Sequence, residues 1–239
     1  MSPAKADHYI GTELELFQHA KHWKSYFASR IKPHLGQDVA EVGAGIGGTT
    51  ALLSPGHRGR WLCLEPDQRL LASVKTAIES GALPAGCEAR AATLSELPVS
   101  ETFDSILYID VLEHIEDDHA EARQAAQRLR PGGKLIILAP AHQWLYSPFD
   151  EAIGHFRRYN RESLAAAVPS ELETVELLYL DLVGLLASAG NRFVSRQSAP
   201  NRSQITLWDN AMVPLSRLLD PLIGNRAGKS VFGVWSKPG

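Results

Sequence analysis

Residues 38–50 read Asp38-Val-Ala-Glu-Val-Gly43-Ala-Gly45-Ile-Gly-Gly48-Thr-Thr50, and this stretch decides the fold. A short apolar run ends in glycines with the spacing Gly-x-Gly-x-x-Gly, and a segment able to form a helix follows directly. Glycine lets the backbone turn sharply and approach a ligand closely, while the first turn of a helix offers unpaired N–H groups. The order strand, glycine turn and helix is the context that this motif requires. The stretch therefore predicts a ligand-binding turn at the end of a buried strand.

The same alternation of apolar runs and helices continues along the chain. Further short apolar runs predict strands at 60–65, 103–109, 134–139, 172–180 and 229–235. Helical segments are predicted at 13–32, 68–79, 118–130 and 161–168. Apolar runs that alternate with helices indicate a parallel sheet covered on both faces, so the fold class is α/β.

Composition limits the class of protein. The chain has 239 residues, of which 44% are hydrophobic and 21% charged, so we expect one domain over 1–239 that buries a full core. The net charge of −3 argues against nucleic acid as a partner. Cys63 and Cys87 have no metal or redox spacing. The N-terminus lacks a secretory pattern and no apolar run spans a bilayer, so a cytoplasmic location is expected.

An acidic residue follows the second apolar run. A carboxylate at Glu65 can accept hydrogen bonds from both ribose hydroxyls of an adenosine cofactor. The geometry serves both NAD and S-adenosylmethionine. None of the six tyrosines is followed four positions later by lysine, so the Tyr-x-x-x-Lys pair of short-chain reductases is missing. Methyl transfer is therefore favoured over hydride transfer.

Four motifs carry a resemblance to a known family: Glu41-x-Gly-x-Gly45, Leu64-Glu-Pro-Asp67, Tyr108 to Ile115, and Leu129 to Lys134. In order and spacing they resemble class I S-adenosylmethionine-dependent methyltransferases over residues 36–140. The resemblance implies a Rossmann-like, seven-stranded and mostly parallel sheet with an antiparallel last strand. It adds an N-terminal helix and, within the acceptor-side region 140–224, a helical cap inserted late in the chain. The stretch 140–159 is similar to a subgroup found beside bacterial glycan, lipid and natural-product enzymes.

The resemblance also implies a cofactor, S-adenosyl-L-methionine, and the residues that hold it. The glycine turn would hold the methionine portion and Glu65 the ribose, with one pair of residues near the adenine and another near the sulfonium. The implied set is Glu41, Gly43, Ala44, Gly45, Glu65, Pro66, Thr93 and Leu94 (near adenine), and Ile109 and Asp110 (near the sulfonium).

The loop 140–160 follows a strand end, where open α/β sheets bind ligands, so we expect it to face the acceptor. A hydroxyl acceptor profits from a general base, and we favour His142, then His155, as the catalytic residue over Asp150 and Glu151. Substrate contacts are predicted for Trp144, Tyr146, Asp150, Arg157, Arg158 and Tyr159. The two arginines are suited to a phosphate or carboxylate on the acceptor, or else they cap the nearby helix or bridge Asp150 and Glu151.

The expected reaction is methyl transfer to a small-molecule or lipid-linked acceptor, which is apolar or bears a phosphate, with oxygen favoured as the methylated atom. N- or C-methylation and a cofactor-binding partner protein without turnover remain alternatives. The apolar region 182–224 fits a helical cap, an acceptor pocket, or a surface for a dimer or a membrane, so monomer and homodimer both stay open. The acidic segment 110–118 lacks a clear ligand geometry, so we expect no metal.

Overall fold

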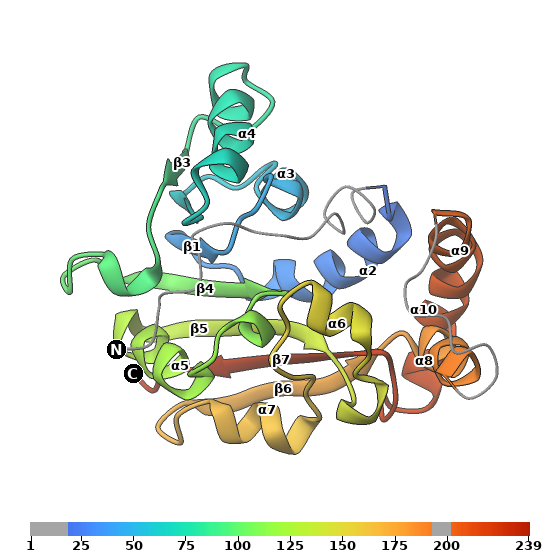
Figure 1. Cartoon of the computed structure of the whole chain (residues 1–239). Coiled ribbons are helices and arrows are strands. Elements are labelled where there is room, and N and C mark those ends of the chain that lie inside the picture. Colours follow the sequence, from blue (N-terminus) through green and yellow to red (C-terminus); the bar gives the residue numbers. More distant parts are fainter. Residues whose placement is uncertain (1–18, 193–201) are drawn as a thin grey trace.

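One mixed sheet organises the molecule. The computed structural model describes residues 19–192 and 202–239. Seven strands form the sheet in the order β3-β2-β1-β4-β5-β7-β6, and β7 runs antiparallel to both of its neighbours (Figure 1). The strands are β1 (Val39–Val42), β2 (Trp61–Leu64), β3 (Cys87–Arg90), β4 (Phe103–Ile109), β5 (Leu129–Pro140), β6 (Glu173–Leu180) and β7 (Ser230–Ser236). The predicted fold class is confirmed.

Strands β1, β2, β4, β6 and β7 lie within about two residues of the ranges that their apolar runs predict. Strand β3 has no matching prediction. It lies at the edge of the sheet, and only Cys87 of its four residues is buried, so it lacks the continuous apolar run of a central strand.

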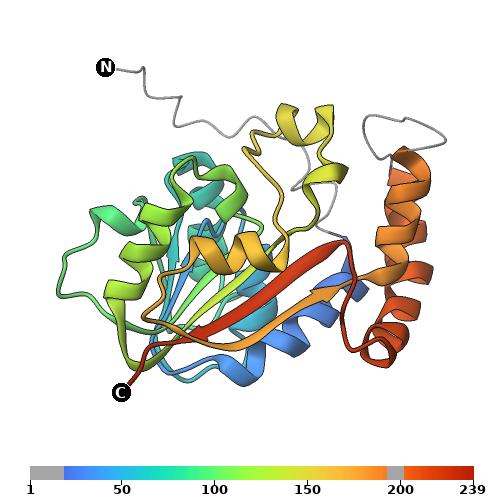
Figure 2. The ribbon, with the colours of Figure 1, turned by 90° about the horizontal axis from the view of Figure 1, so that it is seen from below.

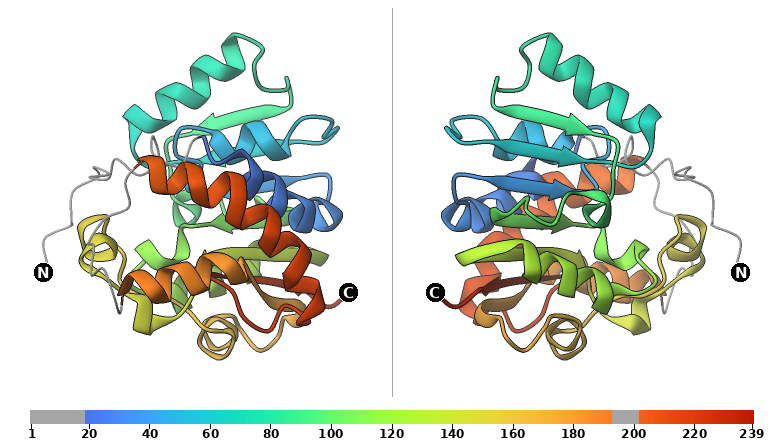
Figure 3. Two further views of the ribbon diagram at one scale, coloured as in Figure 1. Left: turned by 90° about the vertical axis from the view of Figure 1, so that its right-hand side faces the viewer. Right: turned by 90° about the vertical axis from the view of Figure 1, so that its left-hand side faces the viewer.

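Helices cover both faces of the sheet (Figures 2 and 3). They are α2 (Lys21–Ile31), η1 (Lys32–His34), α3 (Gly48–Leu53), α4 (Gln68–Glu79), η2 (Leu94–Glu96), η3 (Leu112–His114), α5 (Asp118–Arg128), η4 (Gln143–Leu145), α6 (Pro148–Ala152), α7 (Arg161–Ala167), α8 (Leu182–Gly190), α9 (Arg202–Leu207), the π-helical η6 (Trp208–Met212) and α10 (Val213–Leu222). Side chains of α5 and α7 join the core on one face. Those of α2, α3, α4, α9, η6 and α10 join the core on the other.

The described parts of 182–224 form a helical cap that docks on α2. The Trp23 ring of α2 lies 5.8 Å from the Trp208 ring of η6, between ring centroids. Backbone N–H of Trp23 donates to the Asp209 carboxylate at 2.8 Å. Leucines nevertheless stay exposed on the outer side of the cap, among them Leu186, Leu218 and Leu222. Contact of this side with a membrane or a second copy therefore stays a prediction.

Among the helices of residues 19–192 and 202–239, none combines the length and the apolar character that crossing a bilayer requires. The predicted helix 13–32 falls partly outside these described residues.

A buried carboxylate in α10 joins the cap to the sheet. Asp220 is fully buried and accepts hydrogen bonds from the Tyr26 hydroxyl at 2.8 Å and from backbone N–H of Asp181 and Leu182 at 2.7 and 3.0 Å. Replacing Asp220 by alanine leaves three buried donors without an acceptor, so we expect the free energy of unfolding to fall by about 3 kcal/mol or more.

Urea denaturation measures this change, and the exposed Glu171→Ala on the loop before β6 is the control. The control should shift the free energy of unfolding by about 0.5 kcal/mol at most. An Asp220→Ala protein as stable as the control would show that this network does not hold the cap.

Candidate cofactor and acceptor site

The carboxyl ends of β1, β2, β4 and β5 meet at one edge of the sheet, and the cap helices lie beyond that edge (Figure 1). The residues that follow these four strands include Gly43, Glu65, Asp110 and His142. Segments far apart in sequence therefore bring the predicted cofactor and acceptor groups to the same edge, as expected for an open α/β sheet.

The glycine turn after β1 requires glycine at its first position. Gly43 has φ +68°, and a Cβ there would lie 2.6 Å from Cγ2 of Val111. Backbone N–H groups of Gly43 and Ala44 donate to the Leu64 carbonyl at 2.8 and 3.0 Å. The turn is thereby fixed to the end of β2, and its backbone can approach a ligand closely.

Glu65 is held rigidly at the end of β2. It is 7% exposed, and its two oxygens accept from backbone N–H of Gly45 and of Asp67, each at 2.9 Å. Burial raises the pKa of Glu65, while these two hydrogen bonds act in the opposite direction. Each carboxylate oxygen has a second lone pair, so the oriented group can still accept the two hydroxyls of a ribose diol. These residues fit S-adenosylmethionine.

Glu41 lies deeper in the sheet than a cofactor ligand needs to. Its Oε2 accepts from the Thr50 hydroxyl at 2.7 Å and from Trp61 Nε1 at 2.8 Å. The side chain thus connects β1 to α3 and β2, and both contacts belong to the core. Its predicted cofactor contact stays a prediction. Burial raises the pKa of Glu41 to about 7, although these hydrogen bonds act to lower it.

This raised pKa makes stability depend on pH. The folded state holds the Glu41 proton more tightly than the unfolded state, whose pKa is near the ordinary 4.5. We therefore expect stability to be highest at the acidic end of this window and to fall as pH rises from about 4.5 to about 7. Glu41→Gln keeps an acceptor for both donors but does not titrate, so its unfolding free energy should lack this decrease with pH. Urea denaturation at pH 5 and at pH 7.5 measures the unfolding free energy of both proteins. The same change between the two pH values in both proteins would contradict the assignment.

The residues predicted near the adenine follow strand β3. Thr93 caps η2, where its hydroxyl and backbone N–H bond Glu96, and Leu94 is buried in the core. The contact of this pair with an adenine ring therefore stays a prediction. Pro66 is exposed beside Glu65, in the predicted position.

Asp110 directly follows β4 with φ +54° and is exposed, whereas Ile109, the last residue of β4, is half-buried. Both residues lie at the edge of the sheet where the resemblance implies the sulfonium.

Asp150 is a buried anchor of the acceptor-side loop. It is fully buried and accepts from Ser147, from His155 Nδ1 at 2.9 Å, and from Arg158 at 2.7 Å. Burial acts to raise the pKa of Asp150, but the hydrogen bonds from His155 and Arg158 bring it well below its ordinary value. Asp150 and Arg158 therefore engage each other, and this geometry does not support their predicted contact with the acceptor.

Arg157 and Tyr159 also hold the loop. The Arg157 guanidinium contacts Asp118 at 2.7 Å and donates to the carbonyls of Ile115 and Glu116. Tyr159 is 1% exposed, and its hydroxyl donates to Asp118 at 2.7 Å. A side chain this deep in the core does not reach an acceptor at the sheet edge. Arg158 contacts Asp150 as the bridging alternative predicts, and the contacts of the two arginines do not support phosphate binding.

His142 lies where β5 ends and is fixed in one tautomer. Its Nε2 lies 2.9 Å from the Gly228 carbonyl, which only accepts, so Nε2 carries the proton and Nδ1 is the basic nitrogen of the neutral ring. The ring stacks on Tyr179 with centroids 5.0 Å apart, and Trp144 lies beside it, 45% exposed. Partial burial lowers the pKa of His142, and Arg158 lowers it further, whereas the bond to Gly228 raises it.

His155 and Tyr146 lie in the same loop. The Tyr146 hydroxyl donates to the His155 carbonyl at 2.7 Å, so it connects two parts of the loop. The His155 ring points inward, with Nδ1 on Asp150 and Nε2 3.8 Å from Oε1 of Glu113. Of the two predicted bases, His142 is the one with a basic nitrogen at the sheet edge.

The sequence prediction missed Lys229, which begins the last run of the chain. Its ammonium lies 4.9 Å from the centre of the Trp208 ring, and the carboxylates of Asp181 and Asp110 act on it. Burial lowers the pKa of Lys229. The next residue, Ser230, pairs with Pro140 at the end of β5, so Lys229 lies beside the end of that strand. Its only sequence signal was the segment 224–230, which resembles a shortened phosphate-binding loop.

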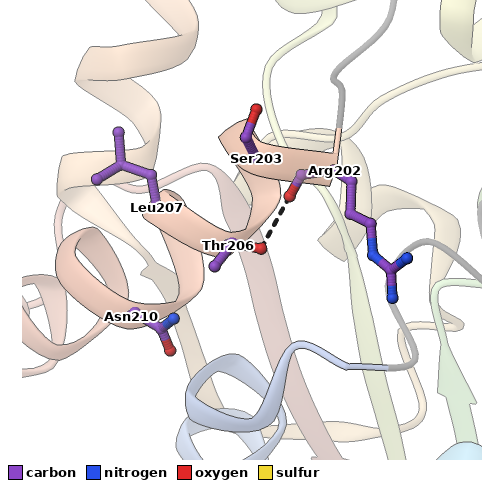
Figure 4. A pocket seen from close by; sticks show the side chains of 5 residues that line it. All are labelled: Arg202, Ser203, Thr206, Leu207 and Asn210. Atoms are coloured by element: carbon purple, nitrogen blue, oxygen red, sulfur yellow. Dashed lines mark hydrogen bonds between the residues drawn. The ribbon is translucent and has the colours of Figure 1, made fainter.

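A shallow pocket lies on the cap, on the α9 side (Figure 4). The Thr206 hydroxyl donates to the Arg202 carbonyl at 2.9 Å within it. Its lining residues are Arg202, Ser203, Thr206, Leu207 and Asn210. None of these belongs to the predicted site, and the pocket carries no part of the functional argument.

The sheet order, the glycine turn and the oriented acid after β2 together fit a protein that binds an adenosyl cofactor. Residues 40–137 match the family model of the methyltransferase domain. A probable S-adenosylmethionine-dependent methyltransferase of Mycolicibacterium smegmatis is 29% identical over 157 residues, which are 65% of this chain and 57% of the relative. The chain thus matches little more than half of that relative's length.

Solved structures share the fold. The N-methyltransferase NodS of Bradyrhizobium japonicum in complex with S-adenosyl-L-homocysteine has a TM-score of 0.58 at 15% identity, with 99% of this chain and 94% of NodS covered. The cyclase SpnF has a TM-score of 0.63 at 13% identity, with 99% and 98% covered. Residues 40–137 of this chain are thus similar to methyltransferase domains, and the chain shares its fold with the N-methyltransferase NodS.

Proposed function

We propose that the chain transfers the methyl group of S-adenosylmethionine to an oxygen of a small-molecule or lipid-linked acceptor. The observation that carries this proposal is the fixed tautomer of His142 at the end of β5. A hydroxyl is a weak nucleophile until a base removes its proton, and Nδ1 of a neutral imidazole is such a base.

The cofactor supplies a methyl group on a positively charged sulfur that is ready to leave. The chain would orient that group, with the Gly43 turn holding the methionine end and Glu65 accepting hydrogen bonds from the ribose. His142 would take the hydroxyl proton while the acceptor oxygen attacks the methyl carbon. Alignment of acceptor and methyl group and exclusion of water supply most of the remaining acceleration.

One feature supports an acceptor that is partly apolar. Trp144 is 45% exposed beside His142. Lys229 adds a cation near the end of β5, which suits an acceptor with an anionic group.

The direct test incubates the full chain with S-adenosylmethionine and a panel of hydroxylated small molecules and lipid-linked sugars. We expect S-adenosylhomocysteine to form in equal amount to a product that carries the new methyl group on oxygen, as located by tandem mass spectrometry. A methyl group on nitrogen or carbon would contradict the choice of atom. Cofactor binding without turnover on every acceptor would favour a partner protein without catalysis.

A further inference from the structure

A partly buried cluster at the acceptor-side loop is not used by the proposed reaction. It consists of Glu113 and His114, in η3 after β4, and His155, in the loop before α7. One potential ligand atom of each lies within 4.8 Å of the others. The rings of the two histidines meet edge to face, with centroids 4.5 Å apart.

Glu113 is the unusual member of this cluster. Its side chain is fully buried, and neither carboxylate oxygen has a hydrogen-bond partner in the described part of the chain. A buried carboxylate without a donor is costly, and proteins normally pair such a group or place it on a metal. Nε2 of His155 lies 3.8 Å from Oε1, which is too long for a hydrogen bond.

His155 is oriented as metal-binding histidines are. Its Nδ1 lies 2.9 Å from Oδ1 of Asp150, and Asp150 is itself held by Arg158 and Ser147. A histidine that binds a metal through one nitrogen almost always donates its other N–H to a carboxylate or a carbonyl. The pairing with Asp150 thus places the proton on Nδ1 and turns the lone pair of Nε2 toward Glu113.

From this geometry we propose that Glu113, His114 and His155 bind a divalent transition-metal ion. Two imidazoles and one carboxylate are an established donor set for zinc and for non-haem iron. Donors about 2.1 Å from an ion in a tetrahedral site lie roughly 3.4 Å apart. The ligand atoms of the cluster lie up to 4.8 Å apart, about 1.4 Å more than this, so side-chain rotations would be needed to close the cluster around the ion.

The ion would fasten two parts of the functional edge together. Its ligands come from the segment that follows β4, directly after Asp110, and from the loop that carries His142 and Trp144. Backbone N–H of Phe156 already donates to the Glu113 carbonyl at 2.8 Å along the same seam. Bound metal therefore protects the loop 148–158 from hydrogen exchange.

The test titrates the full chain with Co²⁺ in the absence of cofactor and acceptor, followed by the visible absorption of the ion and by calorimetry. We expect one Co²⁺ per chain, displaced by Zn²⁺, with slower hydrogen exchange in 148–158. Glu113→Gln should weaken Co²⁺ binding by about 100-fold or more, because an amide is a poor ligand. Asp150→Asn should weaken it by about 10- to 100-fold, as expected when the partner of a metal-bound histidine is changed.

His119→Ala, an exposed histidine on α5, is the matched control and should bind Co²⁺ as the original chain does. Glu113→Gln keeps the shape of the side chain, and unchanged affinity for S-adenosylhomocysteine shows that it folds. The proposal is overturned if the chain binds no Co²⁺ with one-to-one saturation, or if Glu113→Gln binds it equally well. Neither result bears on methyl transfer, which has its own assay.

Discussion

Glu65→Ala is expected to weaken the binding of S-adenosylhomocysteine by at least about 100-fold. The carboxylate that follows β2 is fixed by backbone N–H of Gly45 and Asp67, so it offers its free lone pairs in one orientation. A hydrogen bond to a charged acceptor contributes about 1.5–3 kcal/mol, and the ribose diol makes two. Isothermal calorimetry with the product measures this loss.

Alanine at this position also leaves two backbone donors without their acceptor, so a second variant separates binding from folding. Glu65→Gln keeps the shape and an oxygen, and it should still lose much of the affinity because its amide presents only one acceptor. Glu79→Gln, on the exposed side of α4, should change the affinity by about twofold at most. If Glu65→Ala bound S-adenosylhomocysteine as tightly as the original chain does, the ribose would have to bind elsewhere.

His142→Gln is expected to lower kcat on a hydroxyl acceptor by about 100- to 10,000-fold, the usual contribution of a general base. The base must be neutral to accept a proton, and the pKa of His142 is below its ordinary value. The rate of the original chain should therefore be flat near neutral pH and fall as the medium becomes more acidic than that pKa. The rate of His142→Gln should not show this decrease at acidic pH.

Binding of the cofactor provides the control for that experiment. His142→Gln should bind S-adenosylhomocysteine with unchanged affinity, because the residue faces the acceptor side. His22→Gln, an exposed histidine on α2, should keep both rate and pH profile. If His142→Gln retained kcat within about threefold, the acceptor would not need a base at this position, as expected for a more nucleophilic nitrogen.

Local sequence patterns predicted most of the fold. The run 103–109 is strand β4 with the same limits, and the glycine spacing at 43, 45 and 48 marks the turn between β1 and α3. These features depend on neighbouring residues, since a buried strand needs a continuous apolar run and a sharp turn needs glycine. Strand β3 was missed because it lies at the sheet edge, where only part of its side chains is buried.

The acceptor side was less predictable, because its contacts join distant segments. The loop 140–160 was correctly expected to follow a strand end, but the sequence could not show that Asp150 is buried on Arg158, or that Tyr159 bonds Asp118. The segment 110–118 showed no metal geometry by itself. The third member of the cluster, His155, comes from far along the chain and meets Glu113 only in the folded protein.

A crystal structure with S-adenosylhomocysteine tests the central claim most directly. The claim predicts both ribose hydroxyls at about 3 Å from the Glu65 carboxylate, with the homocysteine portion along the Gly43 turn and the sulfur facing Asp110. A ribose bound away from Glu65, with the turn after β1 untouched by ligand, would contradict it.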